Sequence, residues 1–512
     1  MDTKHTDQVE MDAIRAKLEG GDAGYWKSLE QVAESPEYSK WVDDEFPHRD
    51  SIKDVDRRTF LKVMGASLAL AGLAGCRNLP QEKLVPYVKA PEDRIPGKSL
   101  YYASAFSFGG YANGVLVQSF DGRPTKIEGN PDHPASLGSA DAFTLSHILN
   151  LYDPDRQAPL THNGLASTWD EFLSHARTVL KAQRAAGGSK VRILSETVTS
   201  PTLIAWIEKF IKANPGAKWH SYESLHRDNV KAGSQMAFGE NLLPIYDLAK
   251  ASCIVSLDAD LFHAMPGSIR YARDFASRRD LADEGRINRL YAFQTAPNLT
   301  GSAADHTWSL KPSDLEAVAL ALAARFGANA TGGKSAVPDK VLDAIVADLK
   351  AHQGEALVVA GDQAPASVHA ACHVINAAIG AFGSTVKFAD NFEGVPGSQV
   401  ESLQTLVQDM RAGAVDVLII LGGNPAYSAP ADLKFGEAMR KVANTWHLSS
   451  IPDETSELSK WHLPQAHELE AWGDARAYDG TVSIVQPLIE PLFNGKSSLN
   501  PVEASPTSRS TV

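Results

Sequence analysis

The thiols of this chain are few and widely spaced. Cys76, Cys253 and Cys372 are its three cysteines among 512 residues. Three thiols do not make a disulfide framework, and an iron–sulfur cubane usually takes four thiolates, so no such cluster is expected within this chain. Cys253 opens an apolar run, and Cys372 lies in the apolar sequence VHAACHVINAAI. Both are therefore predicted to be inert core residues that ligate no metal.

Histidines offer the other possible metal ligands. His369 and His373 are four residues apart on a predicted helix and could bind one ion, but no carboxylate flanks them. His133 lies in the sequence DHP, where a turn histidine bonded to the backbone is favoured over a ligand. His220 and His226 are six residues apart, which does not place them on one helical face. The motifs HExxH and CxxC are absent, so no catalytic or metal-binding residue is predicted.

A glycine-rich turn is the sequence feature best suited to bring a ligand near the backbone. Gly422, Gly423, Asn424 and Pro425 directly follow the apolar run VDVLIIL. At the carboxyl end of a parallel strand, such a turn lets a ligand approach closely. The same turn also suits a tight strand-to-helix connection with no ligand. Neither GxGxxG nor GxxxxGK[ST] occurs, so a dinucleotide fingerprint and a P-loop are not supported.

The elements that would position these residues alternate between buried strands and amphipathic helices. Near-continuous apolar runs with helices between them indicate parallel sheets covered on both faces. The helices are expected near 168–184, 201–213 and 314–326, and the apolar runs lie at 191–195, 253–257, 290–294, 356–360, 415–421 and 481–486. The sequence thus predicts an α/β fold with two doubly wound units, 168–330 and 331–450.

Smaller segments flank the two predicted units. Residues 101–167 alternate in polarity and form a β-rich first portion, with a hairpin predicted at Asp121-Gly122. Residues 451–496 are a closing segment, and the small polar residues 497–512 are predicted to be a flexible tail.

The composition excludes several classes of protein. Hydrophobic residues make up 43% and charged residues 22%, as in ordinary globular chains, so a disordered or polytopic membrane protein is not expected. The 49 basic and 62 acidic residues give a formal net charge of −13. A chain this acidic lacks the basic face that binding to nucleic acid requires.

Residues 56–76 combine features of a bacterial export signal. Arg57 and Arg58 precede an apolar run of the length of a signal h-region, which ends in Leu-Ala-Gly before Cys76. The window resembles a twin-arginine translocation signal followed by a lipobox. That resemblance implies lipidation at Cys76 and export through the twin-arginine route. A buried Ala/Leu helix beside a chance Arg-Arg pair is the structural alternative.

The segments on either side of this window differ in character. Residues 1–56 contain 15 acidic and 7 basic residues and, within 25–49, several aromatic ones. This extended acidic segment is either removed or retained and docked. Residues 77–100 carry a proline about every five residues, which favours an extended tether.

Several phrases resemble the molybdopterin oxidoreductases. They occur in family order at 121–138 (DGRPTKIEGNPDHPASLG), 288–323, 421–430 (LGGNPAYSAP) and 463–480 (LPQAHELEAWGDARAYDG). With the acidic N-terminus and the twin arginine, the chain resembles the molybdopterin-oxidoreductase-like half of the B subunits of alternative complex III. The resemblance implies two doubly wound sheets and a small N-terminal β-rich portion.

Departures from the family pattern concern its redox centres. The family's cysteine cluster corresponds to YYASAFSFGGYANG (101–114), which has no cysteine. The metal ligand would fall in 224–234, where Asp228 is only a formal candidate. Asp258 and Asp260 stand where a second glycine turn would be expected, and they would repel a pyrophosphate. The Gly422–Pro425 turn is therefore interpreted as the vestige of a cofactor cleft.

The resemblance implies a role in assembly rather than catalysis. We expect a cofactor-less structural and docking subunit of a quinol-oxidising membrane complex, lipid-anchored on the periplasmic side of the bacterial inner membrane. Its partners would be a ferredoxin-like iron–sulfur subunit, multihaem cytochrome c subunits and quinol-binding integral membrane subunits. A molybdenum enzyme with an unusual ligand such as Asp228 and an unrelated ligand-binding lipoprotein are the alternatives.

Overall fold

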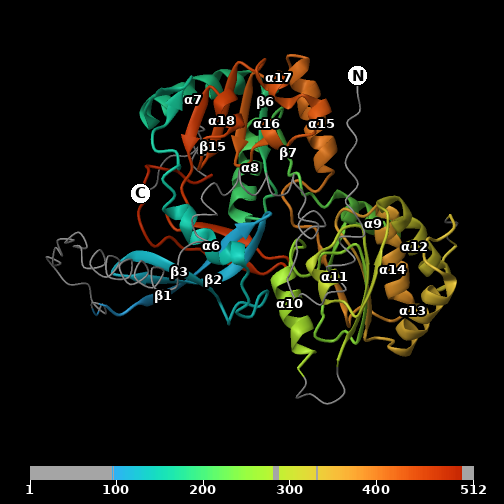
Figure 1. The fold of residues 1–512 in the computed structure, drawn as a ribbon. Coiled ribbons are helices and arrows are strands. Elements are labelled where there is room, and N and C mark those ends of the chain that lie inside the picture. The colour runs from blue at the N-terminus through green and yellow to red at the C-terminus, as the bar shows by residue number, and fades with distance from the viewer. Residues whose placement is uncertain (1–94, 96, 281–286, 330–332, 499–512) are drawn as a thin grey trace, which may run out of the picture. The chain divides into compact units, whose positions relative to one another are not determined.

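The computed structural model describes residues 95, 97–280, 287–329 and 333–498 (Figure 1). The chain divides into two compact units, Met1–Glu92 and Asp93–Val512, and the described residues belong to the second. The predicted translocation signal (Arg57, Arg58), the predicted lipidation site Cys76 and most of the predicted tail lie outside the described residues. Among the helices in the described ranges, none is long and apolar enough to cross a membrane.

The first portion is a three-stranded antiparallel sheet backed by one helix. Strands β1 (Leu100–Phe108), β2 (Tyr111–Phe120) and β3 (Arg123–Gly129) pair in that order. The predicted turn Asp121-Gly122 joins β2 to β3, and its two φ angles of 49° and 89° are those of a two-residue hairpin loop. Helix α6 (Ala142–Leu151) packs Ile148 and Leu151 into the apolar core of this sheet.

A seven-stranded sheet forms the first α/β layer. Its strand order is β5-β4-β16-β15-β14-β6-β7, and the last five strands of that order are parallel. Helices α7 (Trp169–Ala185) and α8 (Pro201–Ala213) cover one face, while α15 (Gln399–Arg411) and α17 (Phe435–Met439) cover the other. The strands are β4 (Thr161–His162), β5 (Leu165–Ala166), β6 (Val191–Ser195), β7 (Lys218–Ser221), β14 (Val417–Leu421), β15 (Asn444–Ser449) and β16 (Trp461–Pro464).

A four-stranded parallel sheet forms the second layer, in the order β11-β10-β9-β12. Figure 1 shows α12, α13 and α14 gathered beside it. Its strands are β9 (Cys253–Leu257), β10 (Arg289–Gln294), β11 (His306–Ser309) and β12 (Ala356–Ala360). Its helices are α9 (Asp228–Phe238), α10 (Ser268–Ser277), α11 (Leu299–Ala303), α12 (Pro312–Ala324), α13 (Asp339–Ala351) and α14 (Ala366–Ala378).

Short elements complete these layers. Strands β8 (Leu242–Tyr246) and β13 (Val386–Asp390) pair antiparallel beside the four-stranded sheet, and β17 (Gly473–Arg476) pairs antiparallel with β18 (Val482–Val485). The apolar run 481–486 therefore forms a hairpin strand rather than a strand of a parallel sheet. Short helices α16 (Pro425–Ser428) and α18 (Glu454–Leu458) and a 3-10 turn at Ala431–Leu433 lie near β14 and β15.

The strand pairing corrects the expected contiguous units. Strand β6 pairs with β14, and β9 pairs with β12, so each sheet takes strands from both 168–330 and 331–450. The chain leaves the seven-stranded sheet after β7, builds the four-stranded sheet, and returns through α15 to β14. An apolar run reveals that a strand is buried but not which strand lies beside it. The α/β class with parallel sheets is nevertheless confirmed.

Candidate functional site

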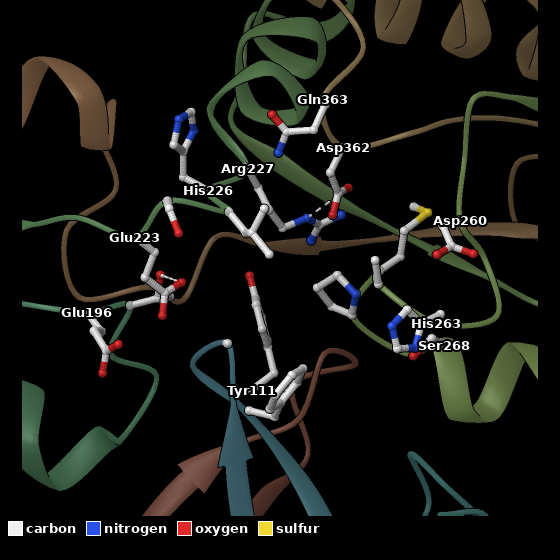
Figure 2. Close-up of a pocket in the computed structure, with 18 of the residues that line it drawn as sticks. Tyr111, Glu196, Glu223, His226, Arg227, Asp260, His263, Ser268, Asp362 and Gln363 are labelled. Atoms are coloured by element: carbon white, nitrogen blue, oxygen red, sulfur yellow. Dashed lines mark hydrogen bonds and ion pairs between the residues drawn. The ribbon is translucent and has the colours of Figure 1, made fainter. Parts of the chain in front are cut away.

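A cavity of about 590 Å³ lies where the carboxyl ends of strands from both parallel sheets meet (Figure 2). Residues that follow β6, β7 and β14 line it from the seven-stranded sheet. Residues that follow β9, β10 and β12 line it from the four-stranded sheet. Ligands of open α/β sheets bind at this edge of the strands, so the cavity is the candidate functional site.

The predicted glycine turn lies on the wall of this cavity. Gly422 and Gly423 adopt φ angles of 71° and 69°, a region that disfavours side chains. A Cβ atom on Gly422 would stand 2.9 Å from Oε2 of Glu196. Asn424 anchors the turn, because its amide Nδ2 donates to Glu454 Oε2 at 2.6 Å and its Oδ1 accepts from Thr455 Oγ1 at 2.8 Å. The close neighbour of the turn is therefore a carboxylate of the chain itself.

Two glutamates with raised pKa values lie beside the turn. Glu196 directly follows β6, and burial raises its pKa, while a hydrogen bond from the Gly423 backbone N–H opposes the rise. Glu223 lies just beyond β7. Burial and then the charge of Glu196 raise the pKa of Glu223 to about 7. Thr197 Oγ1 donates to Glu223 Oε2 at 2.9 Å. The site therefore holds one carboxyl group, Glu223, that is partly protonated near neutral pH.

A network of buried charges forms another part of the site. Lys231 Nζ donates to Glu393 Oε2 at 2.7 Å, and the Tyr111 hydroxyl donates to Glu393 Oε1 at 2.8 Å. Arg227 Nε donates to Asp362 Oδ1 at 3.3 Å, and Figure 2 shows Tyr111 pointing toward this pair. Both cations are thus already paired with carboxylates. The network ties β2 and α9 to the loops after β12 and β13.

The second predicted turn faces the same cavity. Asp258 follows β9 with a φ of 56°, the backbone region that a glycine would favour. Its carboxylate accepts hydrogen bonds from Thr295 N at 2.7 Å and from Thr295 Oγ1 at 2.8 Å. Burial raises the pKa of Asp260, whose Oδ1 has no hydrogen-bond partner among the described residues. The structure therefore brings both predicted turns to one site.

Acidic residues predominate on the cavity wall. Among the described residues that line it, seven carry carboxyl groups and Arg227 carries the guanidinium. The acids are Asp141, Glu196, Glu223, Asp258, Asp260, Asp362 and Glu393. Such a wall favours cationic or neutral groups over anions.

Asp228 does not belong to the cavity wall. Its Oδ2 accepts a hydrogen bond from Ser398 Oγ at 2.9 Å, and its Oδ1 accepts one from Gln399 N at 3.0 Å. The Val400 N–H donates to Oδ2 at 3.2 Å. The carboxylate thereby binds the first turn of α15. This position does not favour the formal assignment of Asp228 as a metal ligand.

A side-chain cluster outside the cavity has donor atoms close enough for a metal ion: His147, His467 and Glu468. His147 Nε2 and Glu468 Oε2 are 3.1 Å apart. The Nδ1 of His467, however, accepts a hydrogen bond from Leu469 N at 3.1 Å. The proton of neutral His467 then sits on Nε2, the atom that faces the cluster. Metal-bound histidines instead donate through their second nitrogen, so this cluster is not built as a metal site.

Both cysteines predicted to be inert are buried. Burial raises the pKa of both thiols, Cys253 and Cys372. A second cluster joins Cys253 to Asp348 and His352. Arg289 and the Tyr291 hydroxyl each donate a hydrogen bond of 2.8 Å to Asp348 Oδ2. A metal ion would have to displace both contacts and also deprotonate a buried thiol, so the structural interpretation is favoured.

The singled-out histidines are spread over different parts of the fold. His369 and His373 are buried in α14, and burial lowers the pKa of each to about 4. No carboxylate joins them in a ligand cluster within the described ranges. His133 Nε2 pairs with Ser483 Oγ at 2.8 Å rather than with the backbone. His220 Nδ1 bonds Ser402 O at 2.9 Å.

Sequence reasoning found both turns of the cavity but missed most of its ionisable residues. Glu196, Glu223 and Arg227 were not singled out, and neither were Tyr111 and Glu393. A usable signal existed for Glu196, because it directly follows the buried run VRILS. Polar residues at that position face the ligand edge of a parallel sheet. No comparable signal marks Tyr111, which reaches the cavity from the antiparallel sheet.

Comparisons with known proteins agree with this architecture. No family model matches the chain. The menaquinone reductase molybdopterin-binding-like subunit of Nitratidesulfovibrio vulgaris (strain Hildenborough) is 23% identical over 493 residues, covering 86% of this chain and 70% of that protein. Among solved structures, acetylene hydratase from Pelobacter acetylenicus matches with a TM-score of 0.58 and 13% identity. That match covers 78% of this chain and 68% of the hydratase, and it supports the fold alone.

Proposed function

We propose that this chain is a structural and docking subunit of a quinol-oxidising membrane complex of the alternative complex III type, with no redox cofactor of its own. The observation that carries the proposal is the similarity to a menaquinone reductase subunit across 86% of the chain. That relative is named molybdopterin-binding-like. The parallel-sheet fold, with its cavity at the strand ends, is consistent with this similarity to a molybdopterin-binding-like protein.

The charges of the cavity support the absence of a pterin cofactor. A pterin dinucleotide carries two phosphates and needs backbone N–H groups and compensating cations. Here the Gly423 N–H already bonds Glu196, and Arg227 is paired with Asp362. At 4 Å, two like charges cost about 4 kcal/mol at an effective dielectric near 20. The residues present therefore do not suit the pyrophosphate of such a cofactor.

The proposed surroundings of the chain follow from its resemblance and its signal window. The partners would be a ferredoxin-like iron–sulfur subunit, multihaem cytochrome c subunits and quinol-binding integral membrane subunits. Lipid attached to Cys76 would hold the folded unit at the periplasmic face of the inner membrane. Within this arrangement the chain fixes the separation of its partners, since electron tunnelling requires closely spaced centres.

Purification of the intact complex from native membranes tests this proposal. With an affinity tag on this chain, we expect cytochrome and membrane subunits to co-purify and to bring iron and haem in stoichiometric amounts. Molybdenum and tungsten, measured by mass spectrometry, should be far below one atom per chain. Oxidised pterin, measured by fluorescence after extraction, should be equally low. A known amount of pterin added to a parallel sample controls for losses.

Two results would overturn the proposal in different ways. A stoichiometric metal and pterin signal would identify a molybdenum or tungsten enzyme. Recovery of the chain from mildly solubilised membranes without any cytochrome or membrane subunit would refute the assembly role and favour an independent ligand-binding protein.

A further inference from the structure

Helix α6 presents an exposed face without charge. Its ten residues, AFTLSHILNL, include no Asp, Glu, Lys or Arg. Leu145 is 43% exposed, Leu149 is 68% exposed, and Tyr152, the C-cap residue, is 36% exposed. Spacings of four and three residues align these side chains in one stripe along the helix. A row of exposed apolar side chains on a helix without charges is typical of an interaction surface.

The stripe borders the candidate cavity at its N-terminal end. Asp141, the N-cap of α6, lines the cavity and accepts a hydrogen bond from Thr144 N at 2.7 Å. The ring of Phe143 stacks on Phe108 with centroids 5.4 Å apart. Phe108 lines the cavity and is 56% exposed, so it stands at the cavity edge. Leu145 follows Asp141 by one helical turn, so the stripe begins beside the cavity wall, whereas Phe143 lies on another side of α6.

The cavity at the end of this stripe has carboxyl groups that no lysine or arginine of the described residues pairs with. Glu196, Glu223 and Asp260 line it, and no lysine or arginine of the described ranges forms an ion pair with them. Lys231 and Arg227 are already held by Glu393 and Asp362. A cation supplied from outside would find three carboxyl groups available.

We infer that the α6 stripe and the acidic cavity form one docking surface for a partner polypeptide, which lays apolar side chains along α6 and inserts a lysine or arginine into the cavity. The inference rests on the proposed docking function and names the chemistry of the partner. A free metal ion or polyamine would account for the cavity but not for the stripe. A membrane would account for the stripe, but anionic headgroups would be repelled by the cavity.

Photo-cross-linking in the intact complex tests the surface. A photoreactive benzoylphenylalanine replaces Leu149, and in a control chain it replaces Leu165, which is 75% exposed on β5 outside the cavity wall. We expect Leu149 to cross-link to one polypeptide of the purified complex, at a peptide that combines apolar residues with a lysine or arginine. Leu165 should give no such adduct. A lipid adduct, or equal labelling at both positions, would overturn the inference.

Charge variants test the cavity half of the surface separately. Leu149→Asp and the double variant Glu196→Gln/Glu223→Gln should each weaken retention of the chain in the complex at least tenfold. The matched control Leu165→Asp should not. The glutamine variant should also make retention less sensitive to salt, because it removes the attraction that salt screens. Thermal unfolding of each purified variant verifies that the chain is folded.

Failure of this inference is distinguishable from failure of the proposed function. If the chain assembles with its complex while Leu149→Asp and the glutamine variant are retained like the parent, the docking surface lies elsewhere and the proposed function stands. If the parent chain assembles with no partner at all, both fall.

Discussion

Glu223 is a cavity residue whose pKa depends in part on a neighbouring carboxyl group. Its pKa of about 7 results first from burial and then from the charge of Glu196. We expect Glu196→Gln to lower the pKa of Glu223 below 7, yet to leave it above its ordinary value, because the larger cause remains. Carbon-13 NMR of labelled glutamate carboxyls, followed across pH 4–9, gives the titration midpoint.

The control for this titration is Glu240→Gln, since Glu240 is exposed and outside the cavity wall. That variant should leave the Glu223 midpoint unchanged. An unchanged midpoint in Glu196→Gln as well would mean that the two carboxyls do not interact.

Arg156 forms an ion pair with Glu470 that is completely buried. The Arg156 and Glu470 side chains are 2% and 0% exposed, and Arg156 Nη2 lies 2.7 Å from Oε2. Arg156→Ala would leave a buried carboxylate without its cation, so we expect the free energy of unfolding to fall by about 3–5 kcal/mol. Urea denaturation measures this loss. The exposed pair Lys190–Asp416 is the comparison, and Lys190→Ala should cost about 0–1 kcal/mol.

The glycine turn after β14 can be tested as an element. A side chain at φ near +69° costs roughly 1–2 kcal/mol wherever it occurs. Gly423→Ala should cost more than that, because its Cβ would stand 3.0 Å from Cγ of Glu196. Gly413 has the same φ of 69°, and a Cβ there would meet no atom within 4 Å, so Gly413→Ala isolates the backbone cost. Urea unfolding of both variants gives the difference.

A third variant separates contact from strain at this turn. Adding Glu196→Ala to Gly423→Ala should recover the excess cost. Equal destabilisation by Gly413→Ala and Gly423→Ala would indicate that Glu196 moves aside freely.

The signal window is a second element whose role can be tested. We expect Arg57→Lys/Arg58→Lys to keep the chain in the cytoplasm and Cys76→Ser to abolish acylation. Cell fractionation and mass spectrometry of the mature N-terminus measure the two effects. Lys27→Arg, outside the window, is the control. Unimpaired export of the double variant would show that the arginine pair is incidental.

Individual elements were more predictable than their arrangement. The apolar runs 191–195, 253–257 and 356–360 coincide with β6, β9 and β12, because residues buried on both faces leave a continuous signal. The hairpin at Asp121-Gly122 was equally predictable, because an Asp-Gly pair favours a two-residue turn. The pairing of β6 with β14 was not, since nothing in either run specifies its neighbour. The same reason hid the acids of the cavity, which come together only when both sheets form.

The whole molecule should lose stability in mild acid. Burial lowers the pKa of five histidines to about 4: His220, His369, His373, His462 and His467. Unfolded histidine titrates near 6.5, so between pH 6.5 and 4 the unfolded chain binds more protons. The stability that these five histidines contribute is fully present above pH 6.5. It is lost as the pH falls, by about 1 kcal/mol for each histidine between pH 6.5 and 5.5.

The titration of Glu223 changes the stability with pH in the opposite direction, but its effect is smaller than that of the five histidines together. Its folded pKa of about 7 lies above its ordinary value of 4.5, so it adds stability at low pH that is lost as the pH rises through 7. Urea unfolding at pH 7.5, 6.5 and 5.5 should therefore still show a steep net decline. His373→Phe should flatten that slope, whereas His306→Asn, at an exposed position, should not. A slope unaffected by His373→Phe would contradict the assignment.

The return of the chain from the four-stranded to the seven-stranded sheet also sets the order of events on the ribosome. Val191 of β6 pairs with Val417 of β14, 226 residues later. At about 5–20 residues per second, translation leaves β6 without that partner for roughly 10–45 s. The four-stranded sheet is complete first, because all its strands emerge within that interval. The nascent chain thus carries a buried-type strand with one unpaired edge for many seconds, during which a chaperone that shields strand edges can bind.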